Sequence, residues 1–364
     1  MIFTDVFNDV TKRGTKIPTN LYLENGLYPI IDQGQSKIAG YTNESDGLFT
    51  EVPAIIFGDH TRVIKYVDTP CFLGADGVKL LRAKDCDANY KYLYYALCSA
   101  NIPNTGYNRH FKWLKEVDIP EHSVEEQHNI VAQLEKIETL ISLRKQQLSK
   151  LDELVKSRFI EMFGNLVIGD KINENKHKIG EIASVTKLAG FEFTKYIQYK
   201  EHGDIIMLRG LNCKKGHLVL DDIKWIDRGT SNLLPRSKLY YGDILMTYAG
   251  TIGDVAMVDA DNKYHLAPNV AKITLTDKMA YNPVFLIHLF MYTNDYIMTF
   301  ASVVAQASIN MEKIRNFEYY FPSAAQQNEF AAFVEQVDKS KFEIQKSLEQ
   351  LETLKKSLMQ KYFG

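Results

Sequence analysis

Two stretches of the chain, 200 residues apart, decide its fold. The first is VEEQHNIVAQLEKIETLISLRKQQLSKLDELVKSRFIEMFG, residues 124–164, and the second is AAQQNEFAAFVEQVDKSKFEIQKSLEQLETLKKSLMQKYFG, residues 324–364. Ten positions carry the same residue in both stretches without a gap, and both stretches close with Lys-Ser, five further residues and Phe-Gly. Because long repeated segments mark repeated structural units, this pattern predicts a chain built from two copies of one unit.

Both stretches carry a narrow apolar stripe at alternating spacings of four and three residues. They contain no proline, and no glycine before the closing one. Such spacing is typical of a coiled-coil helix, so we predict two long helices with apolar seams. The expected seam residues are Ile130, Leu134, Ile137, Ile141, Leu148, Leu151 and Val155 in the first helix, and Phe330, Val334, Val337, Ile344, Leu348, Leu351 and Leu358 in the second.

Charged residues interrupt the two stripes at different positions. Arg144 and Arg158 occupy the first stripe, whereas Lys341 and Lys355 occupy the second. Offset interruptions disfavour pairing of either helix with a copy of itself and suit two unlike helices that pack together. The alternative is two separate amphipathic helices, each packed on its own domain, although such helices seldom need so narrow and long a stripe.

Each predicted helix follows a stretch rich in glycine, tyrosine and β-branched residues. Short apolar runs at 53–57 and 243–247 predict strands, and residues 90–100 and 283–301 predict helices. The expected fold class is α+β, with two α/β domains in tandem, each followed by a long helix. The expected boundaries are 1–122 for the first domain, 123–164 for its helix, 165–178 for a linker, 179–322 for the second domain and 323–364 for its helix.

The sequence lacks the motifs of the common enzyme classes. It has no phosphate-binding loop, no dinucleotide-binding glycine motif, no clustered Cys/His spacing and no serine nucleophile motif. The tetrapeptide NPVF at 282–285 is distantly similar to a loop of adenine methyltransferases, but it lacks the second proline, so we interpret it as a helix start. We therefore expect no catalytic residue, no metal ion and no cofactor.

Composition and charge restrict the function further. Hydrophobic residues make up 45% of the chain and charged residues 24%, which is ordinary for a folded globular protein. Four scattered cysteines, a charged N-terminus and the lack of a long apolar run lead us to expect a cytoplasmic protein with no membrane partner. The formal net charge of −2 is unusual for a stand-alone DNA-binding protein, so a DNA reader of this kind would cluster its basic residues or share its phosphate contacts with a partner.

Polar loops in both domains carry the side-chain types that read base edges in DNA. The turn at 57–62 could also be catalytic or structural, but the second domain does not repeat it, which favours a binding loop. For every candidate the alternative is a solvated loop. The candidates are Gln33, Gln35, Lys37, His60, Arg62, Asn108, Arg109, His110 and Lys112 in the first domain, and Arg209, Lys214, Tyr248, Thr251, Gln306, Ser308 and Asn310 in the second.

In the order of these features the chain resembles the specificity (S) subunits of Type I restriction–modification enzymes over its full length. The resemblance rests on GDHTR at 58–62, GDILMTYAGTIG at 242–253, and the helix starts EEQ at 125–127 and AQQ at 325–327. It implies two target-recognition domains, each reading one half of a bipartite double-stranded DNA site, held apart by two helices in an antiparallel coiled coil. It also implies two methyltransferase (M) subunits docked on the helices, restriction (R) subunits bound through that complex, and no active site in this chain.

Two other functions remain as alternatives. One is a coiled-coil interaction scaffold with two protein-binding modules and no DNA specificity. The other is a stand-alone nuclease or methyltransferase that uses the region of His60.

The first domain also begins almost at Met1, whereas some members of the S-subunit family carry extra residues ahead of it.

Overall fold

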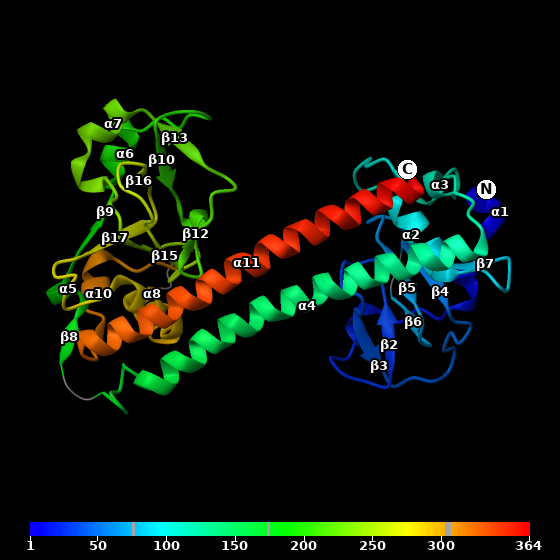
Figure 1. The fold of residues 1–364 in the computed structure, drawn as a ribbon, viewed down its shortest axis with the longest axis horizontal. Helices are drawn as coiled ribbons and strands as arrows, with labels where there is room; N and C mark the ends of the chain where they lie inside the picture. Colours follow the sequence, from blue (N-terminus) through cyan, green and yellow to red (C-terminus); the bar gives the residue numbers. More distant parts are fainter. Residues whose placement is uncertain (75–76, 173–174, 303–306) are drawn as a thin grey trace. The chain divides into compact units, whose positions relative to one another are not determined.

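The computed structural model describes residues 1–364 except 75–76, 173–174 and 303–306. The chain forms two compact units, and each contains parts of both long helices, α4 (Val124–Phe163) and α11 (Ala324–Phe363) (Figure 1). Unit 1 consists of Met1–Gln146 and Gln345–Gly364, and unit 2 consists of Gln147–Ile344. The two 40-residue helices confirm the helices predicted from the repeat. Within the described residues, none of the helices combines the length and the apolar character that crossing a membrane requires.

The two long helices begin with the same hydrogen-bonded cap. The Ser123 hydroxyl accepts the N–H of Glu126 at 3.3 Å, and the Glu126 carboxylate accepts the N–H of Ser123 at 2.8 Å. Ser323 and Gln326 repeat this exchange at 3.4 and 3.2 Å. Reciprocal bonds of this kind satisfy main-chain donors that the first turn of a helix leaves free, and therefore they fix where each helix starts.

Other identical residues of the repeat have structural roles at the helix ends. The side-chain amide of Gln127 donates to the carbonyl oxygen of His122 at 3.0 Å, and that of Gln327 donates to the oxygen of Pro322 at 2.9 Å. Gly164 follows α4 with a φ of 63°, a conformation that ends helices and favours glycine. The repeat therefore encodes both the start and the end of each helix.

Unit 1 contains two sheets. The larger has the order β1-β7-β4-β5 with all neighbours antiparallel, and the smaller has the order β3-β2-β6, with β2 antiparallel to β3 and parallel to β6. The strands are β1 (Phe7–Asp9), β2 (Tyr28–Ile31), β3 (Gly40–Thr42), β4 (Ala54–Gly58), β5 (Ile64–Val67), β6 (Phe72–Leu73) and β7 (Val78–Ala83). The helices are α1 (Phe3–Val6), α2 (Tyr90–Ser99) and α3 (Phe111–Leu114), with short 3-10 turns at Thr11–Arg13 and Thr19–Leu21.

Unit 2 repeats this topology. Its larger sheet has the order β15-β14-β17-β9, and its smaller sheet has the order β13-β10-β16, with β10 antiparallel to β13 and parallel to β16. The strands are β9 (Ala183–Lys187), β10 (Ile205–Leu208), β13 (Lys224–Ile226), β14 (Ile244–Thr247), β15 (Val255–Met257), β16 (Tyr264–Leu266) and β17 (Val270–Leu275). The helices in equivalent places are α5 (Ile179–Ile182), α8 (Pro283–Tyr292) and α10 (Met311–Arg315), whereas α9 (Asn294–Met298) has no counterpart among the described helices of unit 1.

The correspondence extends to the edges of the domains. The pair β8 (Lys176–Lys178) and β18 (Glu318–Tyr320) in unit 2 has its counterpart in the isolated bridge between Ile2 and Asp118 in unit 1. Unit 2 adds α6 (Gly190–Tyr196), the hairpin β11 (Cys213–Lys214) and β12 (His217–Leu218), α7 (Arg228–Leu233), and 3-10 turns at Gly210–Asn212 and Pro235–Ser237. The internal repeat therefore covers the globular domains, although their sequences have almost completely diverged.

The helix expected at 283–301 consists of two helices in the structure. Asn282 caps α8 by accepting the N–H of Val284 at 2.9 Å, which confirms that NPVF is a helix start. The chain then breaks at Thr293, whose hydroxyl donates to the carbonyl oxygen of Leu289 at 2.6 Å. A hydroxyl that hydrogen-bonds to the backbone one turn earlier competes with the hydrogen bonds that continue the helix. The apolar composition of the segment 283–301 gives no sign of this break, so the sequence predicted one helix.

The end of α4 completes the core of unit 2. Phe159 and Phe163 are buried in a cluster with Phe285 of α8 and Phe330 of α11, with ring centroids 5.1–5.7 Å apart. In unit 1, Ile130 and Leu134 of α4 lie in the core, and the last turns of α11 pack against it through Leu358, Met359, Tyr362 and Phe363. Both cores therefore need residues from both helices.

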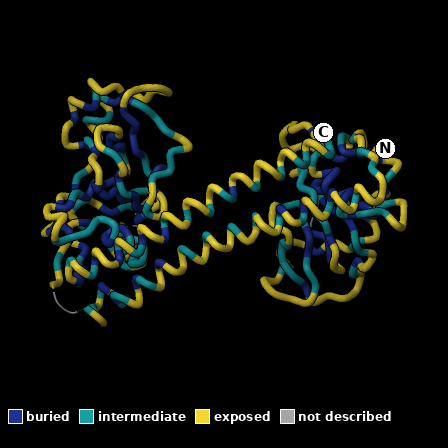
Figure 2. Tube along the Cα trace, in the orientation of Figure 1, coloured by how far each residue is buried: buried dark blue, intermediate teal, exposed yellow. Residues whose placement is uncertain are grey.

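The predicted seam residues are all buried or half-buried, whereas their flanking positions are mostly exposed (Figure 2). Within unit 1, Lys355 pairs with Glu138 at 2.7 Å. Within unit 2, Lys341 pairs with Asp152 at 2.6 Å. The lysines that interrupt the apolar stripe of α11 thus have carboxylate partners on α4.

We predict that the Phe159→Ala substitution lowers the free energy of unfolding of unit 2 by about 3–5 kcal/mol, because it removes a buried ring and leaves a cavity. Thermal and denaturant unfolding of the full chain measure this. Phe342→Ala, on the same unit but 67% exposed, is the matched control and should change stability by no more than about 0.5 kcal/mol. Equal losses for the two substitutions would contradict the assigned core.

Candidate nucleic-acid interface

The first candidate surface starts at the turn between β4 and β5. Gly58 donates its N–H to Val63 at 2.8 Å, and Arg62 donates its N–H back to Gly58 at 2.7 Å. A side chain at Gly58 would begin 2.2 Å from the Thr61 hydroxyl oxygen, so only glycine fits. Arg62 takes a φ of 62°, which is uncommon for a residue with a side chain. The turn is therefore held in one tight conformation.

A second loop, at residues 32–37, is bonded to this turn. The Gln33 side-chain oxygen accepts the N–H of His60 at 3.2 Å, and the Gln33 carbonyl oxygen accepts the Thr61 hydroxyl at 2.6 Å. Gln35 and Lys37 are exposed on the same loop. The structure therefore brings two of the segments singled out in the sequence together.

The third segment is the loop at residues 101–110. The His60 ring stacks on Tyr107 with centroids 4.6 Å apart and planes 8° apart, and His60 Nδ1 lies 3.2 Å from the carbonyl oxygen of Asn108. Arg62 donates to the carbonyl oxygen of Ile102 at 3.1 Å. We call residues 32–37, 58–63 and 101–110 the first loop cluster. Tyr107 is 86% exposed and begins the segment 107–112 that the sequence singled out, although it was not among the individual candidates.

His110 differs from its neighbours because it is fully buried. Its Nδ1 lies 3.0 Å from the carbonyl oxygen of Asp59, and the Asp59 carboxylate accepts the N–H of Phe111 at 2.7 Å. The prediction that His110 is an exposed DNA-binding residue is therefore wrong. The buried His110 side chain anchors the loop at residues 101–110 from inside the domain. Arg109 and Lys112 are exposed, and Lys112 Nζ lies 4.1 Å from the centre of the Trp113 ring.

We predict that Asp59→Ala releases the loop at residues 101–110. The substitution leaves a buried N–H without its acceptor, which should cost about 1–3 kcal/mol and speed amide exchange in that loop. Hydrogen exchange with mass spectrometry measures the change, with the exposed Asp46→Ala as the matched control in the same domain. Unchanged exchange in residues 101–110 would show that Asp59 does not anchor the loop.

The second candidate surface starts at the equivalent turn between β14 and β15. The Thr247 hydroxyl donates to the carbonyl oxygen of Thr251 and accepts the N–H of Asp254 at 3.0 Å. Thr251 itself is exposed. Tyr248 accepts the N–H of Ile309 at 2.8 Å. The turn therefore lies beside the segment that precedes α10, as the β4–β5 turn lies beside the segment that precedes α3.

That segment carries the remaining candidates. Ser308 forms a bridge with Ala249, which places it next to Tyr248, whereas Gln306 lies outside the described residues. Asn310 caps α10 by accepting the N–H of Lys313 at 2.9 Å, so its side-chain oxygen has a structural role. We call residues 247–254 and 307–310 the second loop cluster. Lys187 borders the second loop cluster, because its Nζ lies 5.6 Å from the centre of the Tyr248 ring. It was not among the candidates predicted from the sequence.

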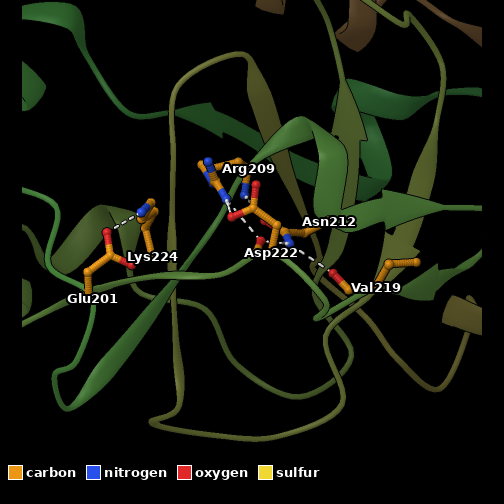
Figure 3. Close-up of polar contacts among 6 residues, drawn as sticks. All are labelled: Glu201, Arg209, Asn212, Val219, Asp222 and Lys224. Atoms are coloured by element: carbon orange, nitrogen blue, oxygen red, sulfur yellow. Dashed lines mark hydrogen bonds and ion pairs between the residues drawn. The ribbon is translucent and has the colours of Figure 1, made fainter. Parts of the chain in front are cut away.

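Arg209 and Lys214 lie on the connection between β10 and β13, where Figure 3 shows Arg209 beside Asp222. Arg209 donates to the carboxylate of Asp222 at 2.7 Å and to its carbonyl oxygen at 2.9 Å, so its guanidinium is held within the connection. The buried Asn212 closes the same loop by donating to Val219 at 2.8 Å and to the Asp222 carbonyl at 2.9 Å. Lys214 is exposed on β11. Of this pair, only Lys214 extends into solvent.

Both loop clusters lie at the same topological position of one repeated fold, yet their exposed side chains differ. This arrangement defines a class of protein with one repeated structural frame and two unlike loop surfaces. The family model of the Type I restriction modification DNA specificity domain matches residues 3–153 and 173–355, and the chain belongs to this family.

Individual relatives agree with the family assignment. The chain is 26% identical over 166 residues to the EcoBI specificity subunit of Escherichia coli, a match that covers 44% of this chain and 35% of that protein. It is 28% identical over 148 residues to the EcoR124I/EcoR124II specificity subunit of Escherichia coli, covering 35% and 36%. The chain thus spans about a third of the length of the curated relatives that it matches.

Solved structures share the fold. The S subunit of a Type I restriction–modification system from M. genitalium matches 100% of this chain and 95% of its own, with a TM-score of 0.60 at 17% identity. A structure from work on complex assembly and conformational transition of the type I R-M system matches 98% of this chain and 94% of its own, with a TM-score of 0.57 at 16% identity. At these identities the likeness concerns the fold alone.

Proposed function

We propose that this chain is the DNA-specificity subunit of a Type I restriction–modification enzyme, and that each domain reads one half of a bipartite target. The observation that carries the proposal is the equivalent placement of two loop clusters with different exposed residues. In the first cluster, Gln35, His60, Tyr107 and Asn108 face the DNA, and in the second cluster Tyr248 and Thr251 do. Amide and hydroxyl groups supply hydrogen bonds to base edges, and the aromatic rings pack beside them.

The two helices form an antiparallel coiled coil in this proposal. The ion pairs between α4 and α11 support this arrangement, because the residue numbers of the partners on α11 fall as the residue numbers on α4 rise. In unit 1, Glu138 pairs with Lys355 and Lys145 with Glu352; in unit 2, Asp152 pairs with Lys341 and Arg158 with Glu329. Seam residues that are buried or half-buried along both helices support it as well.

Partner subunits supply the chemistry. Two methyltransferase subunits dock on the helices, and restriction subunits bind through that complex. The net charge of −2 fits this division, because partners then contribute most of the phosphate contacts. The surroundings of His60 also suit a binding loop, because its ring face is covered by Tyr107 and its Nδ1 lies beside a backbone carbonyl.

We predict that substitutions in the two loop clusters change different halves of the target. Tyr107→Ala with Asn108→Ala should relax one half-site, and Tyr248→Ala should relax the other, because each cluster reads its own bases. Single-molecule mapping of methylated adenines in cells that carry the chain and its methyltransferase measures both halves. A target that is not bipartite, or two halves that change together, would contradict the proposal. A chain that binds all DNA sequences equally would favour the interaction scaffold.

We predict that helix length sets the gap between the half-sites. Seven residues added to the middle of both α4 and α11 lengthen the pair by about 10 Å at ~1.5 Å per residue, which is about three base pairs of DNA. The gap should grow accordingly while both half-sites keep their sequence, as measured by the same adenine mapping. Seven residues added to the linker at 165–178 instead should leave the gap unchanged. A changed half-site sequence, or a constant gap after the helix insertions, would show that the helices are not the spacer.

A further inference from the structure

His60 is held by both of the other segments of the first loop cluster. Its backbone N–H donates to the side-chain oxygen of Gln33 at 3.2 Å, so the loop at 32–37 fixes the position of the residue. Its ring stacks on Tyr107 with the planes 8° apart, so the loop at 101–110 covers one face of the ring. His60 is half-buried, and these contacts restrict the rotation of its side chain.

The contact of Nδ1 determines where the ring of His60 carries its proton. His60 Nδ1 lies 3.2 Å from the carbonyl oxygen of Asn108, and a carbonyl oxygen can only accept a hydrogen bond. Nδ1 is therefore the donor, and because a neutral imidazole has a single N–H, Nε2 is left as an acceptor. Within the described residues, Nε2 has no hydrogen-bond partner and is not buried.

The side chain of Asn108 presents the same kind of group. Its amide nitrogen donates to the carbonyl oxygen of Thr105 at 2.5 Å and to the Thr105 hydroxyl oxygen at 3.3 Å. Both N–H groups of the amide are thus used inside the loop, whereas its oxygen has no partner in the part of the chain that the structure describes. Asn108 is exposed, so this oxygen is a second acceptor at the surface.

The donors near these two acceptors are either used within the cluster or carried on long stems. The Thr61 hydroxyl donates to the carbonyl oxygen of Gln33 at 2.6 Å. Arg109 is exposed, and a charged group on a long side chain also suits a contact with a phosphate. The short side chains that the loops hold in place, His60 and Asn108, therefore offer acceptors.

Acceptors on a protein select donors on the edge of a base. In the major groove those donors are the exocyclic amino groups of adenine and cytosine, whereas guanine and thymine present acceptors there. An acceptor of His60 that faced guanine or thymine would meet another acceptor and lose its hydrogen bond with water, which costs affinity. The arrangement therefore favours adenine or cytosine opposite His60.

We propose that the first loop cluster reads the exocyclic amino group of an adenine or a cytosine, and that His60 Nε2 accepts the hydrogen bond. Asn108 supports the same preference, because its side-chain oxygen is also an acceptor. The inference rests on the proposed function, since it names the chemical group that the first domain recognises in its half of the target. The contact of His60 with the Asn108 carbonyl makes it specific, because that contact sets the proton on Nδ1.

Nitrogen NMR of the histidine rings in the full chain tests the position of the proton. At about pH 8.5, above the range in which histidine usually titrates, His60 should carry its proton on Nδ1 and none on Nε2. His128 is an internal reference, because its Nδ1 lies 2.7 Å from the carbonyl oxygen of Val124. A neutral His60 ring with its proton on Nε2 overturns the proposal, and this measurement needs no variant.

Base analogues test the hydrogen bond to DNA. The Kd of the chain with its methyltransferase is measured on duplexes in which one adenine or cytosine of the first half-site is replaced by an analogue without the amino group. The adenine that becomes methylated is kept intact. Loss of the amino group that His60 reads should raise the Kd about tenfold, because an acceptor in the interface loses its donor. The position of the sensitive analogue shows whether the base is adenine or cytosine.

A histidine substitution assigns this loss to His60. His60→Phe keeps a flat ring against Tyr107 but removes Nε2, so the tenfold effect of the analogue should fall below about twofold. His128→Phe, an exposed histidine with the same Nδ1 contact, is the matched control and should keep the full effect.

An analogue effect of equal size in the two variants overturns the proposal. A His60-dependent loss on removal of a ring-nitrogen acceptor of guanine also overturns it, because His60 would then be a donor. Absence of a bipartite target refutes the proposed function and this inference with it. A bipartite target without coupling between His60 and an amino group refutes this inference alone.

Discussion

Each long helix has to bury both of its ends, and its two ends lie in the cores of different units. The start of α4 places Ile130 and Leu134 in the core of unit 1, and its end places Phe159 in the core of unit 2. Helix α11 begins with Phe330 in unit 2 and ends with Tyr362 against unit 1. Neither core is complete without residues from both helices. The apolar stripe on each helix therefore has to serve two cores, and each compact unit contains a part of both helices.

This constraint leaves the loops free to differ. The turn of the first cluster is closed by main-chain bonds at Gly58, and that of the second by the hydroxyl of Thr247, so the exposed residues carry little of the burial that stabilises the fold. The ion pairs of the helices have a similarly limited energetic role, because pairs at exposed positions contribute about 0–1 kcal/mol each. Lys341 and Lys355, which interrupt the apolar stripe of α11, each pair with a carboxylate on α4.

The sequence alone predicted the features that depend on local periodicity and capping. Both long helices, the strand at β4 and the helix start at Asn282 were found this way. The shared topology of the domains was not, because it depends on strand pairing between residues far apart in the chain. The burial of His110 was not predicted either, because His110 contacts Asp59, a residue 51 positions away in the chain. The resemblance to S subunits, by contrast, was carried by the order of features and needed no tertiary information.

In the function proposed for this chain, its two loop clusters read two half-sites independently. Amide exchange of the chain assembled with its methyltransferase, measured on duplexes that carry both half-sites, one half-site or neither, distinguishes this from joint or non-specific binding. A complete target should slow exchange at 58–63 and 101–110 together with 247–254, and removal of one half-site should restore fast exchange at one cluster only. Protection that is independent of sequence, or lost from both clusters when one half-site is removed, would show that the clusters do not read separate half-sites.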